Sequence, residues 1–194
     1  MSRLEVITGQ MFSGKSEELA RRLRRATYAN RRIMVIKPTQ DHRKSRSIFV
    51  IIQEDPRLKD YKYLATQTLS HPKELENLIN AFHPDILAID ETQFLEAKFL
   101  EYIEELLEKN KSRGFTIIAA GLDMDAWRKP FGIMPQLMAM ADEVLKLTAI
   151  CPICLGENGP AIFTQKKGGS GEKIEIGDAK IYEARCRVCH TIPK

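Results

Sequence analysis

The most informative part of the sequence is VITGQMFSGKSEEL, residues 6–19. Apolar residues typical of a strand lead into Gly9, and the spacing Gly9-x-x-x-x-Gly14-Lys15-Ser16 opens a segment with helical periodicity. This is the Walker A spacing, in which loop N–H groups and a helix N-terminus surround a phosphate group. We expect Lys15 to reach the β- and γ-phosphates and the Ser16 hydroxyl to ligate Mg²⁺.

All eight residues of this loop are predicted to bind phosphate: Gly9, Gln10, Met11, Phe12, Ser13, Gly14, Lys15 and Ser16. The alternative is an ordinary glycine turn capped by Ser13 or Ser16. The strand pattern before the loop and the helical pattern after it favour the phosphate loop.

A second motif, ILAID at residues 86–90, supplies the acidic partner that such a loop needs. Four apolar residues ending in a carboxylate are typical of a buried strand whose C-terminal end faces the phosphates. Asp90 is therefore the candidate Walker B residue, holding Mg²⁺ directly or through water. Glu91 follows and could act as a base, although an Asp-Glu pair after a strand also suits the first turn of a helix.

The remaining pattern predicts an α/β fold, a P-loop (RecA-like), mainly parallel sheet with helices on both faces. Apolar runs predict strands at Leu4–Thr8, Ile33–Lys37, Asp85–Asp90 and Phe115–Leu122, with further candidates at Ser47–Ile52 and Val144–Leu147. Helical periodicity fits Lys15–Ala29, Lys73–Phe82, Lys98–Lys111 and Met134–Asp142.

Composition places the chain among soluble globular proteins. It has 194 residues, 43% hydrophobic and 29% charged. No apolar run approaches the ~18 residues of a membrane span, and the N-terminus has no secretory pattern. We therefore expect a cytoplasmic protein with no membrane partner. The pattern changes near Ala149, which predicts a nucleotide-binding domain over residues 1–148 and a small cysteine-bearing domain over residues 149–194.

All four cysteines lie in two CxxC pairs, at Cys151 and Cys154 and at Cys186 and Cys189. Two such pairs are typical of one structural Zn²⁺ held by four thiolates. His190 could replace Cys189 as the fourth ligand, but the regular spacing favours the thiol. Two disulfides are the alternative, which a reducing compartment disfavours.

The net charge of +4 is concentrated locally, because six arginines fall within residues 21–32. A basic stripe of this kind could hold nucleic acid. Tyr28 is the one aromatic residue among the arginines, which is too few to stack on successive bases, so a solvated helix face is the simpler interpretation and nucleic acid is not the expected partner.

The motifs GQMFSGKSEEL, VIKPTQDHR, AIDETQF, AAGLDMD, KPFG, LTAICPIC, FTQ and IYEARCRVCH follow one another along nearly the whole chain. In this order they resemble the cytosolic-type (class II) thymidine kinases. The resemblance implies a P-loop core and a zinc-bearing domain whose loop, the lasso, closes over the nucleoside. It also implies phosphorylation of thymidine at the 5′-hydroxyl with ATP and Mg²⁺, a homotetramer, and inhibition by thymidine triphosphate (dTTP).

By this resemblance Glu91 matches the catalytic base. Asp41, Arg43, Asp90 and Gln93 match positions near the phosphates. The residues that match or neighbour positions around the nucleoside are Met11, Phe94, Leu122, Trp127, Phe131, Thr164, Tyr182 and the lasso stretch Lys173, Ile174, Glu175, Ile176 and Gly177.

Three positions depart from the family pattern. Gln10 stands where the family usually has proline, and Asp178 replaces a glycine of the lasso. Ala126 stands where many members carry an aromatic ring over the base, and we expect the neighbouring Trp127 either to supply that ring or to pack under its loop.

Two other functions compete with the kinase. One is a nucleic-acid-binding ATPase that grips a strand with a zinc ribbon and the arginines of residues 21–32. The other is a nucleotide sensor that keeps the fold without turnover. Deoxyuridine is an alternative nucleoside within the kinase interpretation.

Overall fold

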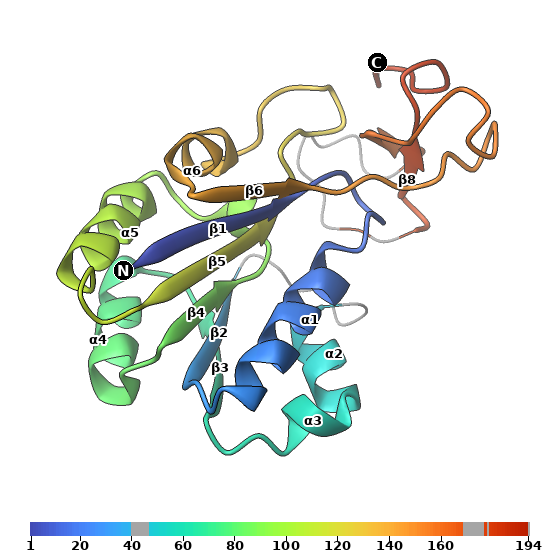
Figure 1. Ribbon diagram of the computed structural model, residues 1–194. Helices are drawn as coiled ribbons and strands as arrows, with labels where there is room; N and C mark the ends of the chain where they lie inside the picture. The colour runs from blue at the N-terminus through green and yellow to red at the C-terminus, as the bar shows by residue number, and fades with distance from the viewer. Residues whose placement is uncertain (40–46, 169–176, 178, 194) are drawn as a thin grey trace.

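The computed structural model describes residues 1–39, 47–168, 177 and 179–193. Six parallel strands form one sheet in the order β3-β2-β4-β5-β1-β6, and a two-stranded antiparallel sheet, β7-β8, follows near the C-terminus (Figure 1). The sheet strands are β1 (Arg3–Thr8), β2 (Ile33–Pro38), β3 (Leu64–Leu69), β4 (Ile86–Ile89), β5 (Thr116–Gly121) and β6 (Glu143–Lys146).

Helices cover both faces of this sheet, as Figure 1 shows. On one face lie α1 (Lys15–Tyr28), α2 (Ile48–Glu54) and α3 (Pro56–Lys59), and on the other α4 (Pro72–Phe82), α5 (Lys98–Lys109) and α6 (Met134–Met140). Alternation along β1 separates the two cores: Leu4 and Val6 pack with α4, α5 and α6, whereas Ile7 packs with α1 and α2. The predicted α/β fold with a parallel sheet is confirmed.

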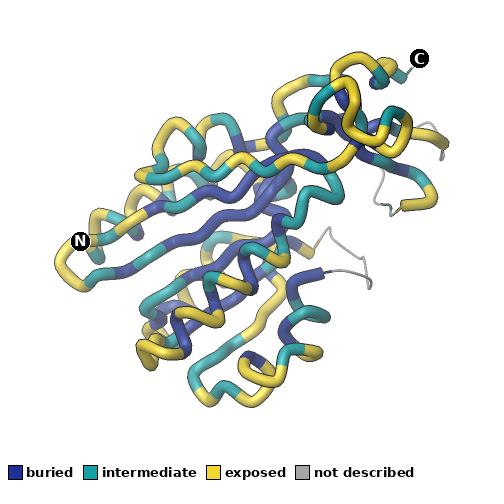
Figure 2. The backbone as a smooth tube through the Cα atoms, turned by 45° about the vertical axis from the view of Figure 1, so that its right-hand side comes forward, coloured by how far each residue is buried: buried dark blue, intermediate teal, exposed yellow. Residues whose placement is uncertain are grey.

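The central strands are the most deeply buried part of the chain (Figure 2). In β4 and β5 nearly every side chain is buried, because helices cover both faces. The C-terminal ends of β1, β4 and β5 meet at one edge, beside the segment that carries β7 (Phe163–Lys166) and β8 (Tyr182–Arg185). The loop of residues 9–16 begins at this edge, and Asp90 and Glu91 follow β4 there.

One predicted strand is wrong. The run Ser47–Ile52 forms the start of α2, with Ser47 as the residue before the helix. Its β-branched residues favour a strand locally, but Ile48 and Ile52, four residues apart, are both buried in the core beside α1. Packing therefore overrides the local preference.

The pattern also missed β3 and α3. The strand β3 is an edge strand with three exposed polar residues in succession, so it shows no clean alternation. In α3 the Asp55 carboxylate accepts hydrogen bonds from the N–H groups of Arg57 and Leu58, and Pro56 occupies the first turn. Among the described residues no helix is long and apolar enough to cross a membrane.

Candidate active site

The phosphate loop joins β1 to α1 and depends on glycine at its first position. Gly9 has a φ of 135°, and a Cβ there would collide with the carbonyl oxygen of Leu147. At the end of the loop, Gly14 adopts a left-handed conformation immediately before the first residue of α1. The loop and the helix N-terminus thus meet as anion binding requires.

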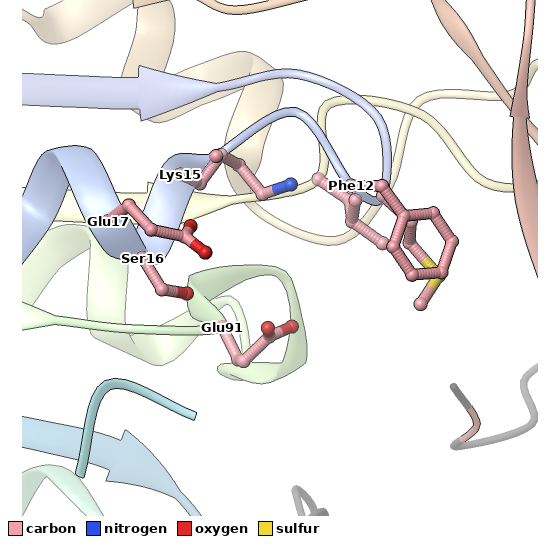
Figure 3. A pocket seen from close by; sticks show the side chains of 8 residues that line it. Phe12, Lys15, Ser16, Glu17 and Glu91 are labelled. Atoms are coloured by element: carbon pink, nitrogen blue, oxygen red, sulfur yellow. The ribbon is translucent and has the colours of Figure 1, made fainter. Parts of the chain in front are cut away.

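The residues at the start of α1 line a pocket at this loop. Figure 3 shows Lys15 and Ser16, from α1, and Glu91, from the loop after β4, around one opening. The Lys15 ammonium donates a hydrogen bond to the carbonyl oxygen of Gln10 at 2.8 Å. The pocket therefore combines a cation, a hydroxyl and the two carboxylates of Glu17 and Glu91 beside a loop whose form suits an anion.

Asp90 and Ser16 fit a magnesium site. The Asp90 carboxylate is 2% exposed, and its Oδ2 lies 3.5 Å from Ser16 Oγ and accepts a hydrogen bond from the N–H of Ile48 at 3.2 Å. Hydroxyl and carboxylate oxygens are ligands that Mg²⁺ prefers. The two motifs, 74 residues apart in sequence, are thus adjacent in the fold.

Glu91 is held in an unusual backbone conformation at the mouth of the pocket. Its φ is 54°, in the left-handed region that a residue with a side chain rarely adopts. The carboxylate accepts a hydrogen bond from Gln93 Nε2 at 2.6 Å. Gln93 Oε1 in turn accepts from the N–H of Leu122 at 3.0 Å. The backbone conformation of Glu91 and the hydrogen bond from the Gln93 side chain together orient the Glu91 carboxylate in the pocket lining.

The four cysteines gather at one point beyond the sheet. Their sulfur atoms all lie within 4.8 Å of one another, and no disulfide joins them. Burial opposes ionisation of Cys151, but hydrogen bonds from main-chain groups of Cys186, Cys154 and Ile153 lower its pKa to about 6. A hydrogen bond with Cys186 and burial raise the pKa of Cys189 to about 12. The cluster fits a tetrahedral zinc site, in which the cation would compensate four thiolates.

Comparisons with known proteins agree with this geometry. The sequence model of the family described as thymidine kinase matches residues 2–190. The chain belongs to the thymidine kinase family. A thymidine kinase of Mesomycoplasma hyopneumoniae (strain 7448) is 40% identical over 189 residues, covering 97% of this chain and 95% of the relative. One from Mycoplasma mobile is also 40% identical, over 96% of this chain and 86% of the relative.

Membership of the thymidine kinase family implies the use of ATP and Mg²⁺, which the pocket at Lys15, Ser16 and Asp90 can accommodate. Of the residues predicted around the nucleoside, Met11 and Leu122 line that pocket. The N–H of Met11 donates a hydrogen bond to Thr164 Oγ1 at 3.1 Å. The β7 strand of the cysteine-bearing segment is therefore attached directly to the phosphate loop.

The two phenylalanines predicted near the nucleoside pack against each other. The Phe94 and Phe131 rings meet edge to face, with centroids 5.6 Å apart. Tyr182 is buried in β8, paired with Lys166 of β7. Gly177 lies against Ile181. Contact of these residues with a thymidine kinase substrate stays a prediction.

Trp127 has a structural partner in this fold. Its Nε1 donates a hydrogen bond to the carbonyl oxygen of Pro193 at 3.1 Å. The position supports the packing alternative, and stacking of Trp127 on a base stays a prediction. The predicted Asp41 and Arg43, and the lasso residues Lys173, Ile174, Glu175, Ile176 and Asp178, lie outside the described residues.

No sequence motif singles out His190 and Arg128 as residues that support the site. His190 is 5% exposed, and its ring nitrogens lie 3.0 Å from Arg128 Nε and 3.2 Å from the carbonyl oxygen of Thr164. Burial, and next the charge of Arg128, lower the pKa of His190. The His190 ring is thus engaged by Arg128 and Thr164, and Cys189 completes the cluster of four cysteines.

Proposed function

We propose that the protein transfers the γ-phosphate of ATP to the 5′-hydroxyl of thymidine, giving thymidine monophosphate in nucleotide salvage. The observation that carries the proposal is the position of Glu91, which faces Lys15 and Ser16 of the phosphate loop across one pocket. An acceptor hydroxyl in this pocket would lie between a base and the phosphate to be transferred.

The roles of the residues follow from this arrangement. Main-chain N–H groups of residues 9–16 and the Lys15 ammonium would bind the phosphates, while Ser16 and Asp90 would hold Mg²⁺. Bound Mg²⁺ supplies positive charge that neutralises the phosphate oxygens. Glu91 takes the proton of the 5′-hydroxyl as the 5′-oxygen bonds to the γ-phosphorus. The bond from that phosphorus to the bridging oxygen breaks, and ADP leaves.

The nucleoside is proposed to lie between the phosphate loop and the cysteine-bearing segment. Met11 and Leu122 offer apolar contacts in the pocket, and Thr164 joins Met11 by a hydrogen bond. An apolar slot of this kind suits the thymine ring and its methyl group. Deoxyuridine, which lacks the methyl group, is the alternative substrate that the assay should include.

One structural Zn²⁺ is proposed at the four cysteines, with residues 149–194 as the domain that it stabilises. The buried core there is small and consists of Cys151, Ala161, Ala184 and Cys186, with partly buried neighbours. A core of this size needs a metal to fold stably. Free thiols also fit the reducing cytoplasm that we expect. The homotetramer and the inhibition by dTTP stay predictions.

The nucleic-acid-binding ATPase is the second candidate, and the ion pairs of α1 weigh against it. Arg22 pairs with Glu5, Glu18 and Glu143, and Arg21 pairs with Glu18. Two of the α1 arginines are therefore already compensated by carboxylates, which weakens the basic stripe as a phosphate-binding surface.

The test is a parallel assay of purified protein with Mg·ATP. One series contains thymidine, deoxyuridine, deoxycytidine and deoxyadenosine, and the product is analysed for nucleoside monophosphate. The other contains single-stranded DNA, and phosphate release is measured. Thymidine monophosphate is the expected product; phosphate release that depends on DNA, without a monophosphate, would establish the ATPase instead.

A further inference from the structure

We propose that His190 and Arg128 are positioning residues that hold Thr164 against Met11 and so shape the nucleoside end of the pocket. This inference rests on the proposed function, because its readout is the affinity for thymidine. It begins from Thr164, which is 4% exposed and joins two parts of the molecule. Its Oγ1 accepts from the N–H of Met11 in the phosphate loop, while its carbonyl oxygen faces His190 Nε2.

The hydrogen bonds of His190 determine its tautomer. Arg128 Nε always carries a proton, so at 3.0 Å the His190 Nδ1 must accept. The ring proton of the neutral imidazole then sits on Nε2, from which it is donated to Thr164 at 3.2 Å. Arg128 Nη2 also donates to the carbonyl oxygen of His190 at 3.0 Å. One guanidinium thus fixes both the ring and the backbone of His190.

Arg128 is presented by a tight turn. Asp125 Oδ1 accepts hydrogen bonds from the N–H groups of Trp127 and Lys129, both at 2.9 Å. Arg128, between them, has a φ of 61°, a strained conformation for a residue with a side chain. Its guanidinium carbon lies 4.4 Å from the centre of the Phe163 ring. The contacts that the side chain makes offset the strain of the backbone.

The chain after His190 is also bonded to β7. The N–H of Thr191 donates to Gln165 Oε1 at 2.8 Å, next to Thr164 in β7. Trp127 Nε1 holds Pro193, as described above. Residues 190–193 therefore form a strap between the turn at residues 125–129 and β7, and Thr164 is the point at which this strap reaches the phosphate loop.

Substitutions of His190 separate its two hydrogen bonds. In His190→Asn the amide oxygen stands near the position of Nδ1 and retains the acceptor for Arg128, but the donor to Thr164 is lost. In His190→Gln the amide nitrogen stands near Nε2 and retains that donor. We expect the KM for thymidine to rise about tenfold in His190→Asn, the scale of one lost hydrogen bond. It should stay within about threefold of the wild type in His190→Gln.

Arg128→Met tests the other partner of the Arg128–His190 contact, at a position far in sequence from the cysteine pairs. It keeps the length of the side chain and removes every donor to His190, so the KM for thymidine should again rise about tenfold, with the KM for ATP and the zinc content unchanged. Lys129→Met is the matched control: it removes the same charge from the next, exposed residue, and both KM values should stay at the wild-type level.

Emission of Trp127, the single tryptophan, reports on the strap in the same samples. A red shift in Arg128→Met and His190→Asn, without a shift in Lys129→Met, is expected. A wild-type KM for thymidine in both Arg128→Met and His190→Asn would overturn the positioning role. Equal increases in the KM for thymidine and the KM for ATP in these variants would also overturn it. Absence of thymidine phosphorylation by the wild type would overturn the proposed function as well, so the two failures are distinguishable.

Discussion

Gln93 Nε2 lies 2.6 Å from Glu91 Oε2 and donates a hydrogen bond to it. Gln93 is 3% exposed, and its Oε1 accepts from the N–H of Leu122. The amide group is thus anchored to the end of β5 on one side and orients the candidate base on the other. Gly121 and Gly132 pack directly against Gln93, where a Cβ on either would collide with it. The orientation of Glu91, the candidate general base, therefore depends on three segments of the chain: residues 91–93, residues 121–122 and residue 132.

Gln93→Met should lower kcat by about tenfold with little change in the KM for ATP, because the Glu91 carboxylate loses the orienting hydrogen bond from Gln93. Steady-state kinetics with ATP and thymidine measure both quantities. Gln93→Glu, which places a second carboxylate beside Glu91, should lower kcat further. Wild-type kcat in Gln93→Met would show that Glu91 needs no such support.

Glu91→Gln should lower kcat by about 100-fold or more, the usual scale for loss of a positioned base. The affinity for ATP, measured by direct binding, should stay near that of the wild type because the phosphate loop is intact. Lys15→Ala is the contrasting variant and should weaken ATP binding and turnover together. If Glu91→Gln retained near-normal kcat, another group would have to accept the proton.

Removal of zinc should loosen the contact between β7 and the phosphate loop, where the nucleoside is proposed to bind. Protein purified without chelator is expected to contain about one zinc per chain, the stoichiometry of a four-cysteine site. Chelation, or Cys154→Ser, should shift the emission of Trp127 and raise the KM for thymidine by about tenfold or more, because β7 loses its support. Elemental analysis without stoichiometric zinc would contradict this prediction.

The ion pairs of α1 predict a pH effect on stability. The hydrogen bond from Arg21 has the largest effect on Glu18; it is opposed by desolvation and aided by a weaker hydrogen bond from Arg22, and together these lower the pKa of Glu18 from 4.5 to about 2. A depressed folded-state pKa stabilises above about pH 4.5, and this contribution is lost as the pH falls toward 2. The unfolding free energy should therefore fall more steeply over this range in the wild type than in Glu18→Gln.

The difference should be below about 1 kcal/mol, because the pair lies at the surface. Urea titrations at several pH values measure it. Glu104→Gln, on the exposed face of α5, is the control and should show the wild-type slope. If the unfolding free energy fell with pH at the same slope in the wild type and in Glu18→Gln, Glu18 would not contribute to the loss of stability in acid.

The sequence predicted those parts of the molecule that are locally encoded. The phosphate loop, Asp90 and the cysteine pairs each depend on spacing within a few residues, so their partners could be named in advance. The predicted strand at Ser47–Ile52 is wrong because α2, the helix found there, has only seven residues, too few for periodicity to separate the two structures. This helix follows from contact with α1, a neighbour that sequence pattern alone does not reveal.

The supports of the site were beyond sequence reasoning for the same reason. Met11 and Thr164 are 153 residues apart, and Arg128 and His190 are 62 apart. No motif links either pair, because each contact forms only when distant segments pack together: β7 against the phosphate loop, and His190 against the turn at residues 125–129. The left-handed backbone of Glu91 likewise has no glycine or asparagine to signal it.

The proposed transfer to thymidine can be followed with a label in the γ-phosphate itself. ATP labelled in the γ-phosphate is incubated with Mg²⁺, thymidine and either the wild type or Glu91→Gln, and the labelled products are separated. We predict that the wild type places the label in thymidine 5′-monophosphate, with Glu91→Gln slower by about 100-fold. Label found in free phosphate, with none in thymidine monophosphate, would contradict the proposed kinase activity.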